Sequence, residues 1–93
     1  MAVIARHLLI SGRVQDVFYR NWTVDIAKGL GLTGWVRNRM DGSVEAVVQG
    51  EADVVERFVA LAHDGPSAAR VAGIAVSDAA MTELTGFEKR ATV

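Results

Sequence analysis

The chain has 93 residues, of which 51% are hydrophobic and 23% are charged, and its formal net charge is −1. A chain of this length folds around one hydrophobic core, so we expect a single domain over residues 1–93. The charge balance offers no general attraction to nucleic acids or anionic membranes, and the lack of cysteine excludes disulfides, thiolate metal sites and a cysteine nucleophile. We see no signal peptide or membrane helix and expect a cytoplasmic protein.

The first half of the chain predicts a strand, a helix and a hairpin. Apolar residues on both alternations of Ile4–Ser11 favour a central strand that is buried. Apolar residues at helical spacing within Arg20–Leu30 predict a helix that ends at a glycine-rich stop. Two further strands, over Thr33–Arg39 and Ser43–Gln49, flank an Asp-Gly turn and are therefore expected to form a hairpin.

The second half predicts one more helix and two more strands. After Gly50, acidic residues and then an apolar stripe indicate a helix, which ends at Asp64–Pro66. Arg70–Ser77 predicts a fourth strand and Gly86–Val93 a shorter fifth. This order is that of the α+β class, a ferredoxin-like split βαβ sandwich in which two helices pack on one face of an antiparallel sheet.

The segment Gly12–Arg20 carries the strongest indication of function. It leads from the first strand into the first helix, and backbone N–H groups in such a tight turn point together into a concavity. The helix N-terminus adds partial positive charge, and Arg20 adds a fixed cation. An arginine at a helix start is most often a solvated residue, and its charge opposes the helix dipole, an opposition that a bound anion would offset. We therefore expect an anion-binding site.

The predicted topology brings Asn38 to the same place. A crossover helix joins the first two strands, so these strands run parallel and end at the same edge of the sheet. With the third strand between them they lie roughly 10 Å apart. Arg20 and Asn38 can then reach a phosphate-sized ion from opposite sides. On its own, an asparagine beside a hairpin turn would be interpreted as a turn former.

Two separated segments resemble the signatures of the acylphosphatase family. Gly12–Arg20 reads GRVQDVFYR and matches the first signature, Gly-x-Val-Gln-Gly-Val-x-Phe/Tyr-Arg, except that Asp16 replaces a glycine. The second signature is matched throughout, by Gly34–Asn38, Gly42, Val44 and Gly50. The likeness extends along almost the whole chain and includes Gly65–Val71, which is similar to the family's link into the fourth strand.

The resemblance implies hydrolysis of the carboxyl–phosphate bond of acyl phosphates without a metal or cofactor. It implies that Arg20 holds the phosphoryl group and that Asn38 positions the attacking water. It also implies that backbone amides of the loop bind the phosphoryl group together with the Arg20 side chain, namely those of Gln15, Asp16, Val17, Phe18, Tyr19 and Arg20. The chemistry agrees, because an acyl phosphate has a good leaving group and needs placed charge and an aligned nucleophile more than an acid or a base.

Asp16 is the departure from the family pattern that bears on activity. The glycine of the family is explained if the loop needs a conformation that is costly for a residue with a Cβ, and aspartate tolerates such a conformation better than most residues. Its carboxylate would repel a bound phosphate unless it points into solvent or pairs with Arg13 or Arg20. We expect reduced phosphate affinity. A catalytically weak anion-binding or regulatory domain is the alternative function.

The expected partner is a small-molecule acyl phosphate, with inorganic phosphate as an inhibiting product, and we expect a monomer without a membrane partner. RNA-recognition modules share this order of elements, but they stack bases on aromatic residues of the first and third strands. Neither predicted strand carries one, so no nucleic-acid partner is expected. Acidic and histidine residues form no cluster at metal-ligand spacing, and no metal is expected. No pocket for the acyl group can be identified from the sequence.

Overall fold

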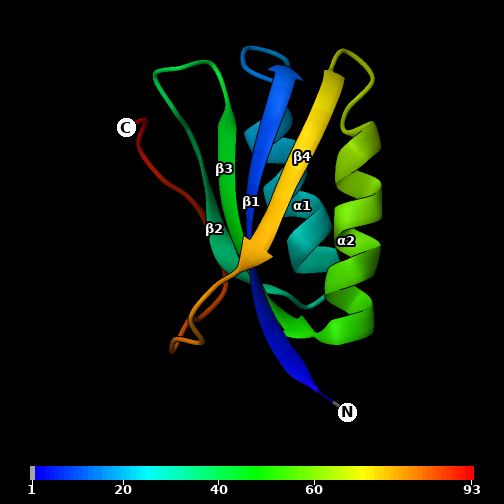
Figure 1. Ribbon diagram of the computed structural model, residues 1–93, viewed down its shortest axis with the longest axis vertical. Helices are drawn as coiled ribbons and strands as arrows, with labels where there is room; N and C mark the ends of the chain where they lie inside the picture. The colour runs from blue at the N-terminus through cyan, green and yellow to red at the C-terminus, as the bar shows by residue number, and fades with distance from the viewer. Residues whose placement is uncertain (1) are drawn as a thin grey trace.

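The computed structural model describes residues 2–93, which form a sheet with two helices packed on one face (Figure 1). The elements are β1 (Val3–Arg13), α1 (Tyr19–Gly29), β2 (Thr33–Asn38), β3 (Val44–Glu51), α2 (Ala52–Asp64), β4 (Arg70–Asp78) and β5 (Phe87–Lys89). The strands lie in the order β4-β1-β3-β2-β5. The predicted ferredoxin-like α+β fold is confirmed. Neither helix is long and apolar enough to cross a membrane within the part of the chain that is described.

The sheet is antiparallel in its four long strands and parallel at one edge. β3 pairs antiparallel with β1 and with β2, and β1 pairs antiparallel with β4. β5 instead pairs parallel with β2, because the chain leaves β4 at one edge of the sheet, crosses below it and returns along β2 in the same direction (Figure 1). The sequence predicts an antiparallel sheet with a short additional C-terminal strand, and the parallel pairing of that strand makes the sheet mixed.

The chain continues alongside β2 after β5 ends. The Arg90 N–H donates to the Val36 carbonyl at 2.8 Å, and the Val93 N–H donates to the Asn38 carbonyl at 3.2 Å. The strand predicted over Gly86–Val93 is regular over only three residues, Phe87–Lys89. Backbone hydrogen bonds to β2 nevertheless continue as far as Val93. This pairing places Lys89 and the residues after it beside the strand that carries Asn38.

The hydrophobic core lies between the sheet and the helices. Alternate residues of the central strands point toward the helices and are buried there: Leu8, Ile10, Val36, Val44, Ala46 and Val48. Phe58 of α2 and Ala27 of α1 cover them and are themselves fully buried. The other face of β1 is only partly covered, so His7 and Leu9 are half-buried there. The prediction that this strand is central is confirmed, since β1 lies between β4 and β3, but it is buried most fully on the face that the two helices cover.

A glycine lets β1 turn toward the functional loop. The register of β1 with β4 shifts between Ser11 and Gly12, and Gly12 has a φ of 116°. A Cβ at Gly12 would lie 2.2 Å from the Arg70 carbonyl oxygen, which no larger residue can tolerate. β1 can therefore pair with β4 as far as Arg13, which is further than predicted, before the chain enters the loop.

Candidate active site

The loop between β1 and α1 is anchored by its apolar residues. Val14, Val17 and Tyr19 are buried, and the Tyr19 hydroxyl donates a 2.5 Å hydrogen bond to the Ala62 carbonyl of α2. Burial raises the pKa of the Tyr19 phenol, so this group stays protonated. These contacts fix the loop against the core and leave Asp16 and Phe18 exposed.

Two non-glycine residues of the loop have left-handed backbone conformations. Asp16 has a φ of 61° and Phe18, the N-cap residue of α1, a φ of 64°. The conformation of Asp16 accounts for the family's glycine at this position, because only glycine adopts it without a steric cost. Aspartate is among the residues that tolerate it best, as the sequence predicts.

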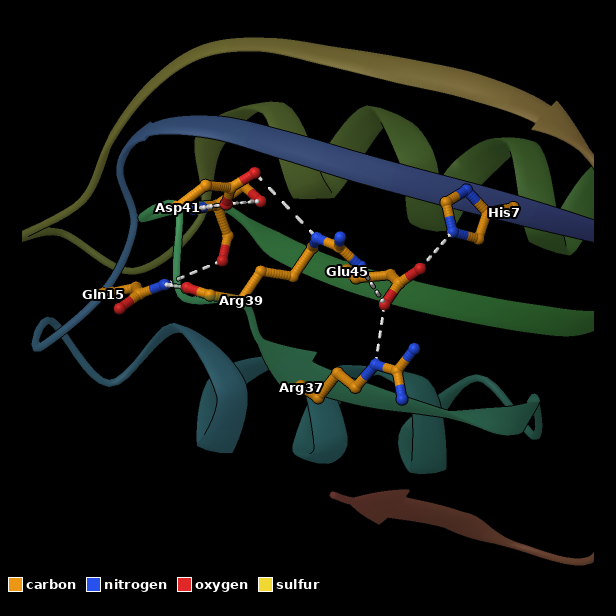
Figure 2. A network of polar contacts seen from close by, with 7 residues as sticks. His7, Gln15, Arg37, Arg39, Asp41 and Glu45 are labelled. Atoms are coloured by element: carbon orange, nitrogen blue, oxygen red, sulfur yellow. Dashed lines mark hydrogen bonds and ion pairs between the residues drawn. The ribbon is translucent and has the colours of Figure 1, made fainter. Parts of the chain in front are cut away.

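The side chain of Gln15 ties the loop to the β2–β3 hairpin. Its Nε2 donates to the carbonyl of Arg39 at 2.7 Å and to the carbonyl of Ser43 at 2.8 Å (Figure 2). The Arg39 N–H also donates to the Ser43 carbonyl, which closes the hairpin at the end of β2. The sequence assigned Gln15 only a backbone amide for phosphate, whereas its side chain sets where the loop lies relative to Asn38.

A cavity of about 320 Å³ opens between this loop and the end of β2. Its lining residues are Val14, Asp16, Phe18, Tyr19, Arg20, Asn21, Asn38 and Lys89. Arg20 and Asn38 therefore share one cavity, as the topology predicts. Gln15 and Val17 do not line it, although both were predicted to contribute to phosphate binding through their backbone amides.

The sequence did not identify two of the polar residues that line the cavity. Lys89 Nζ donates to Asn21 Oδ1 at 3.2 Å, which places a second cation beside the start of α1. Asn21 directly follows Arg20 and could have been inferred from that position. The sequence gives no indication that Lys89 lies at the cavity, because only the parallel pairing of β5 with β2 brings it there.

The start of α1 presents uncompensated positive charge to the cavity. Among the residues that the structure describes, no side chain caps this helix, and its first turn contains no acidic residue. The first N–H groups of a helix have no partner within the helix and carry the positive end of its dipole. With Arg20 in the same turn, this helix end is suited to bind an anion with two or more negative oxygens.

Asn38 has a buried carbonyl oxygen that lacks a partner. The residue is 8% exposed, and among the described residues its Oδ1 accepts no hydrogen bond. Burying an amide oxygen without a hydrogen bond costs free energy. Asn38 also lines the cavity, so its amide group lies next to a space that a water molecule or a ligand can occupy.

Asp16 brings a negative charge to the rim of the same cavity. Its side chain is exposed, and within residues 2–93 it forms no ion pair with Arg13 or Arg20. Neither pairing that the sequence left open is present. The Asp16 carboxylate therefore does not neutralise Arg20, and its exposed side chain lies at the rim of the cavity.

The open face of the sheet supports the strand that carries Asn38. Glu45 of β3, which is 7% exposed, accepts hydrogen bonds from Arg37 Nε at 2.7 Å and Arg39 at 3.3 Å (Figure 2). Its other oxygen lies 2.6 Å from His7 Nε2 on β1. Arg37 and Arg39 flank Asn38, so this network fixes the backbone on both sides of it. His7 thus has a structural contact that the sequence did not indicate.

We expect the Glu45 network to make stability depend on pH below neutrality. Burial alone would raise the pKa of Glu45, but hydrogen bonds from His7, Arg37 and Arg39 and the charge of Arg37 outweigh it and lower the pKa to about 2. The ordinary value is 4.5. Because the pKa of Glu45 is lower in the folded protein than in the unfolded chain, ionised Glu45 stabilises the folded state at any pH above 4.5. This contribution is lost as the pH falls from 4.5 toward 2.

Urea unfolding of the wild type and Glu45→Gln at pH 7 and pH 3 measures this contribution. At pH 7 we expect the free energy of unfolding of the wild type to exceed that of Glu45→Gln by about 2 kcal/mol. At pH 3 we expect this difference between the two proteins to be smaller by about 1–2 kcal/mol. A difference between the two proteins that is the same at both pH values would contradict the account.

Comparison with known proteins decides the family. A model of the acylphosphatase family matches residues 6–89. The chain belongs to the acylphosphatase family. An acylphosphatase of Azoarcus sp. strain BH72 is 61% identical over 84 residues, which cover 90% of this chain and 86% of the relative. An acylphosphatase of Acidovorax sp. strain JS42 is 49% identical over 92 residues, which cover 99% of this chain and 95% of the relative.

The solved structures give the same result for the fold. An acylphosphatase from Coxiella burnetii superposes on this chain with a TM-score of 0.91 at 33% sequence identity. The superposition covers 95% of this chain and 93% of the Coxiella protein. The acylphosphatase fold therefore extends through the loop, the hairpin and the C-terminal segment that form the cavity.

Proposed function

We propose that this chain is an acylphosphatase that hydrolyses the carboxyl–phosphate bond of small acyl phosphates without a metal or cofactor. One observation carries the proposal: Asn38, whose buried carbonyl oxygen has no hydrogen-bond partner among the described residues, lines the same cavity as Arg20 and the uncapped start of α1. The cationic side of the cavity suits a phosphoryl group. The amide oxygen suits a water molecule that attacks it.

The proposed reaction assigns a separate task to each group. Arg20 and the backbone amides of the loop residues that line the cavity bind the phosphoryl oxygens and stabilise the charge that spreads over them in the transition state. Asn38 Oδ1 accepts a hydrogen bond from the attacking water and aligns its oxygen with the phosphorus. The bond between phosphorus and the bridging oxygen breaks, its electron pair leaves with the carboxylate, and the protons of the water pass to the phosphate and the solvent.

No general base is needed in this scheme. An amide oxygen does not take up a proton at neutral pH, so the contribution of Asn38 is geometric. The Tyr19 phenol donates to Ala62 and is protonated, so it is not available as a base. A carboxylate is a good leaving group, which reduces the demand on the nucleophile.

Hydrolysis of benzoyl phosphate by the purified protein tests the proposal. We expect turnover that EDTA does not reduce and that inorganic phosphate inhibits competitively, because the product binds where the phosphoryl group does. Phosphate binding without turnover would instead support the alternative, a regulatory anion-binding domain, which the Asp16 carboxylate at the rim favours.

Removing the charge of Asp16 is expected to tighten phosphate binding. At a separation of about 5 Å and a dielectric between those of water and a protein surface, one unit charge repels another by about 1–3 kcal/mol. Because the Asp16 side chain is exposed, we expect the lower part of this range. The inhibition constant of phosphate should then fall about tenfold in Asp16→Asn.

Asp16→Asn and Asp16→Gly separate charge from backbone strain. Asparagine keeps the shape and the tolerance of a positive φ but loses the charge, whereas glycine also relieves the conformation at φ 61°. We expect similar phosphate inhibition constants in both variants and a higher unfolding temperature only in Asp16→Gly. Unchanged phosphate inhibition in both would rule out the electrostatic effect.

A further inference from the structure

Phe18 is exposed in a way that the fold does not explain. Its side chain is 78% exposed, although it lies between Val17 and Tyr19, which are both buried. The left-handed backbone at Phe18 turns these two neighbours into the core and the phenyl ring outward. A non-glycine residue adopts this conformation at a cost in free energy, and exposing a phenyl ring adds to it. Such strain is characteristic of functional sites.

Phe18 combines a place in the lining of the cavity with an exposed side chain. Phe18 lines the cavity together with Arg20, two residues further along the chain. Of the other lining residues, Val14 and Tyr19 are buried and the remainder are polar or charged. Phe18 is therefore the one large apolar side chain that the described part of this cavity exposes. A phosphoryl group held by Arg20 has its acyl group attached through a single oxygen, within reach of the phenyl ring.

We propose that Phe18 binds the acyl group and that the preferred substrates carry an aromatic or extended apolar acyl group. This inference rests on the proposed function and names the substrate class of the same site. An aromatic or flat apolar group packs against the phenyl ring and removes apolar surface of both partners from water. An acetyl group is too small to cover the ring, so acetyl phosphate gains little from it.

The ratio of kcat/KM for benzoyl phosphate to that for acetyl phosphate measures this contact. Phe18→Asn removes the ring and keeps a residue that tolerates the left-handed conformation, and Phe18→Ala removes the ring alone. We expect both variants to lose about fivefold to tenfold in kcat/KM for benzoyl phosphate, and less than about twofold for acetyl phosphate. The inhibition constant of inorganic phosphate should stay within about twofold, because phosphate has no acyl group.

Met40→Ala is the matched control. Met40 is a large apolar residue that is 88% exposed near the end of β2 and does not line the cavity. Its replacement should leave the ratio of the two substrates unchanged, whereas a shift equal to that of the Phe18 variants would show a general effect of surface apolarity and overturn the inference.

Two outcomes distinguish failure of this inference from failure of the proposed function. If the wild type hydrolyses both substrates and the Phe18 variants lose equally on both, or on neither, Phe18 does not contact the acyl group. If the inhibition constant of phosphate changed in the Phe18 variants as much as kcat/KM does, the role of Phe18 would be to maintain the conformation of the loop, and the inference would fail. If the wild type hydrolyses neither substrate, the proposed function fails and the inference about Phe18 fails with it.

Discussion

Replacing Arg20 with glutamine is expected to lower kcat/KM for benzoyl phosphate by about a thousandfold or more while the protein stays folded. Its guanidinium is proposed to bind two phosphoryl oxygens at once and to stabilise the charge of the transition state, a contribution that reaches 10³ or more when an arginine assists phosphoryl transfer. Glutamine cannot carry this charge. Steady-state kinetics on benzoyl phosphate measures the loss.

Arg20→Lys and Arg13→Gln separate the possible reasons for that loss. Lysine keeps the charge without the planar fork, so Arg20→Lys should recover only part of the activity. Arg13 is exposed at the end of β1 and lies outside the cavity, so Arg13→Gln should retain nearly full activity. If Arg13→Gln and Arg20→Gln lost activity equally, the effect would be one of overall charge and not of a bound phosphoryl group.

The same substitution should not destabilise the fold. Arg20 lies in the first turn of α1, where a cation opposes the helix dipole, and no residue described in the structure forms an ion pair with it. Arg20→Gln should therefore unfold at the same temperature as the wild type or slightly above it. Greater stability with lost activity is the pattern of a residue retained for function.

Replacing Asn38 with alanine is expected to lower kcat by about a hundredfold or more and to leave phosphate binding almost unchanged. An interaction made chiefly with the attacking water acts in the transition state and contributes little to ground-state binding. Alanine leaves the water without its acceptor, and loss of alignment by about 1 Å is enough for an effect of this size. Measured kcat together with the phosphate inhibition constant separates the two effects.

Asn38→Asp provides the isosteric comparison. Aspartate keeps an oxygen where Oδ1 lies but brings a negative charge toward the phosphoryl group, so we expect it to weaken phosphate binding as well as turnover. Asn38→Ala also removes a buried oxygen that has no partner among the described residues, so its free energy of unfolding should equal or exceed that of the wild type. A raised KM with unchanged kcat in Asn38→Ala would make Asn38 a binding group.

The sequence predicts the meeting of Arg20 and Asn38 because their approach depends on topology. A crossover helix forces β1 and β2 to run parallel, and both residues then fall at one edge of the sheet. Hydrophobic periodicity finds the helices for a similar reason, since each is recorded in the local spacing of apolar residues. These features depend on chain order and local pattern, which a single sequence contains.

Other parts of the site depend on side-chain directions that local pattern does not record. The Gln15 side chain bonds two carbonyls of the hairpin, and its sequence position gives no indication of this. Lys89 reaches the cavity through the pairing of the last strand, whose sheet edge the sequence did not specify. Phe18 would be taken for a core residue from its type, and only its backbone conformation shows that its ring is turned outward.

A single turnover of benzoyl phosphate in ¹⁸O-labelled water, followed by mass spectrometry of both products, tests the central claim most directly. If Asn38 holds the water in line with a phosphoryl group bound by Arg20, the labelled oxygen appears in inorganic phosphate and the benzoate stays unlabelled. Label in the benzoate would mean that water attacks the carbonyl carbon, and it would contradict the assignment of this cavity to phosphoryl transfer.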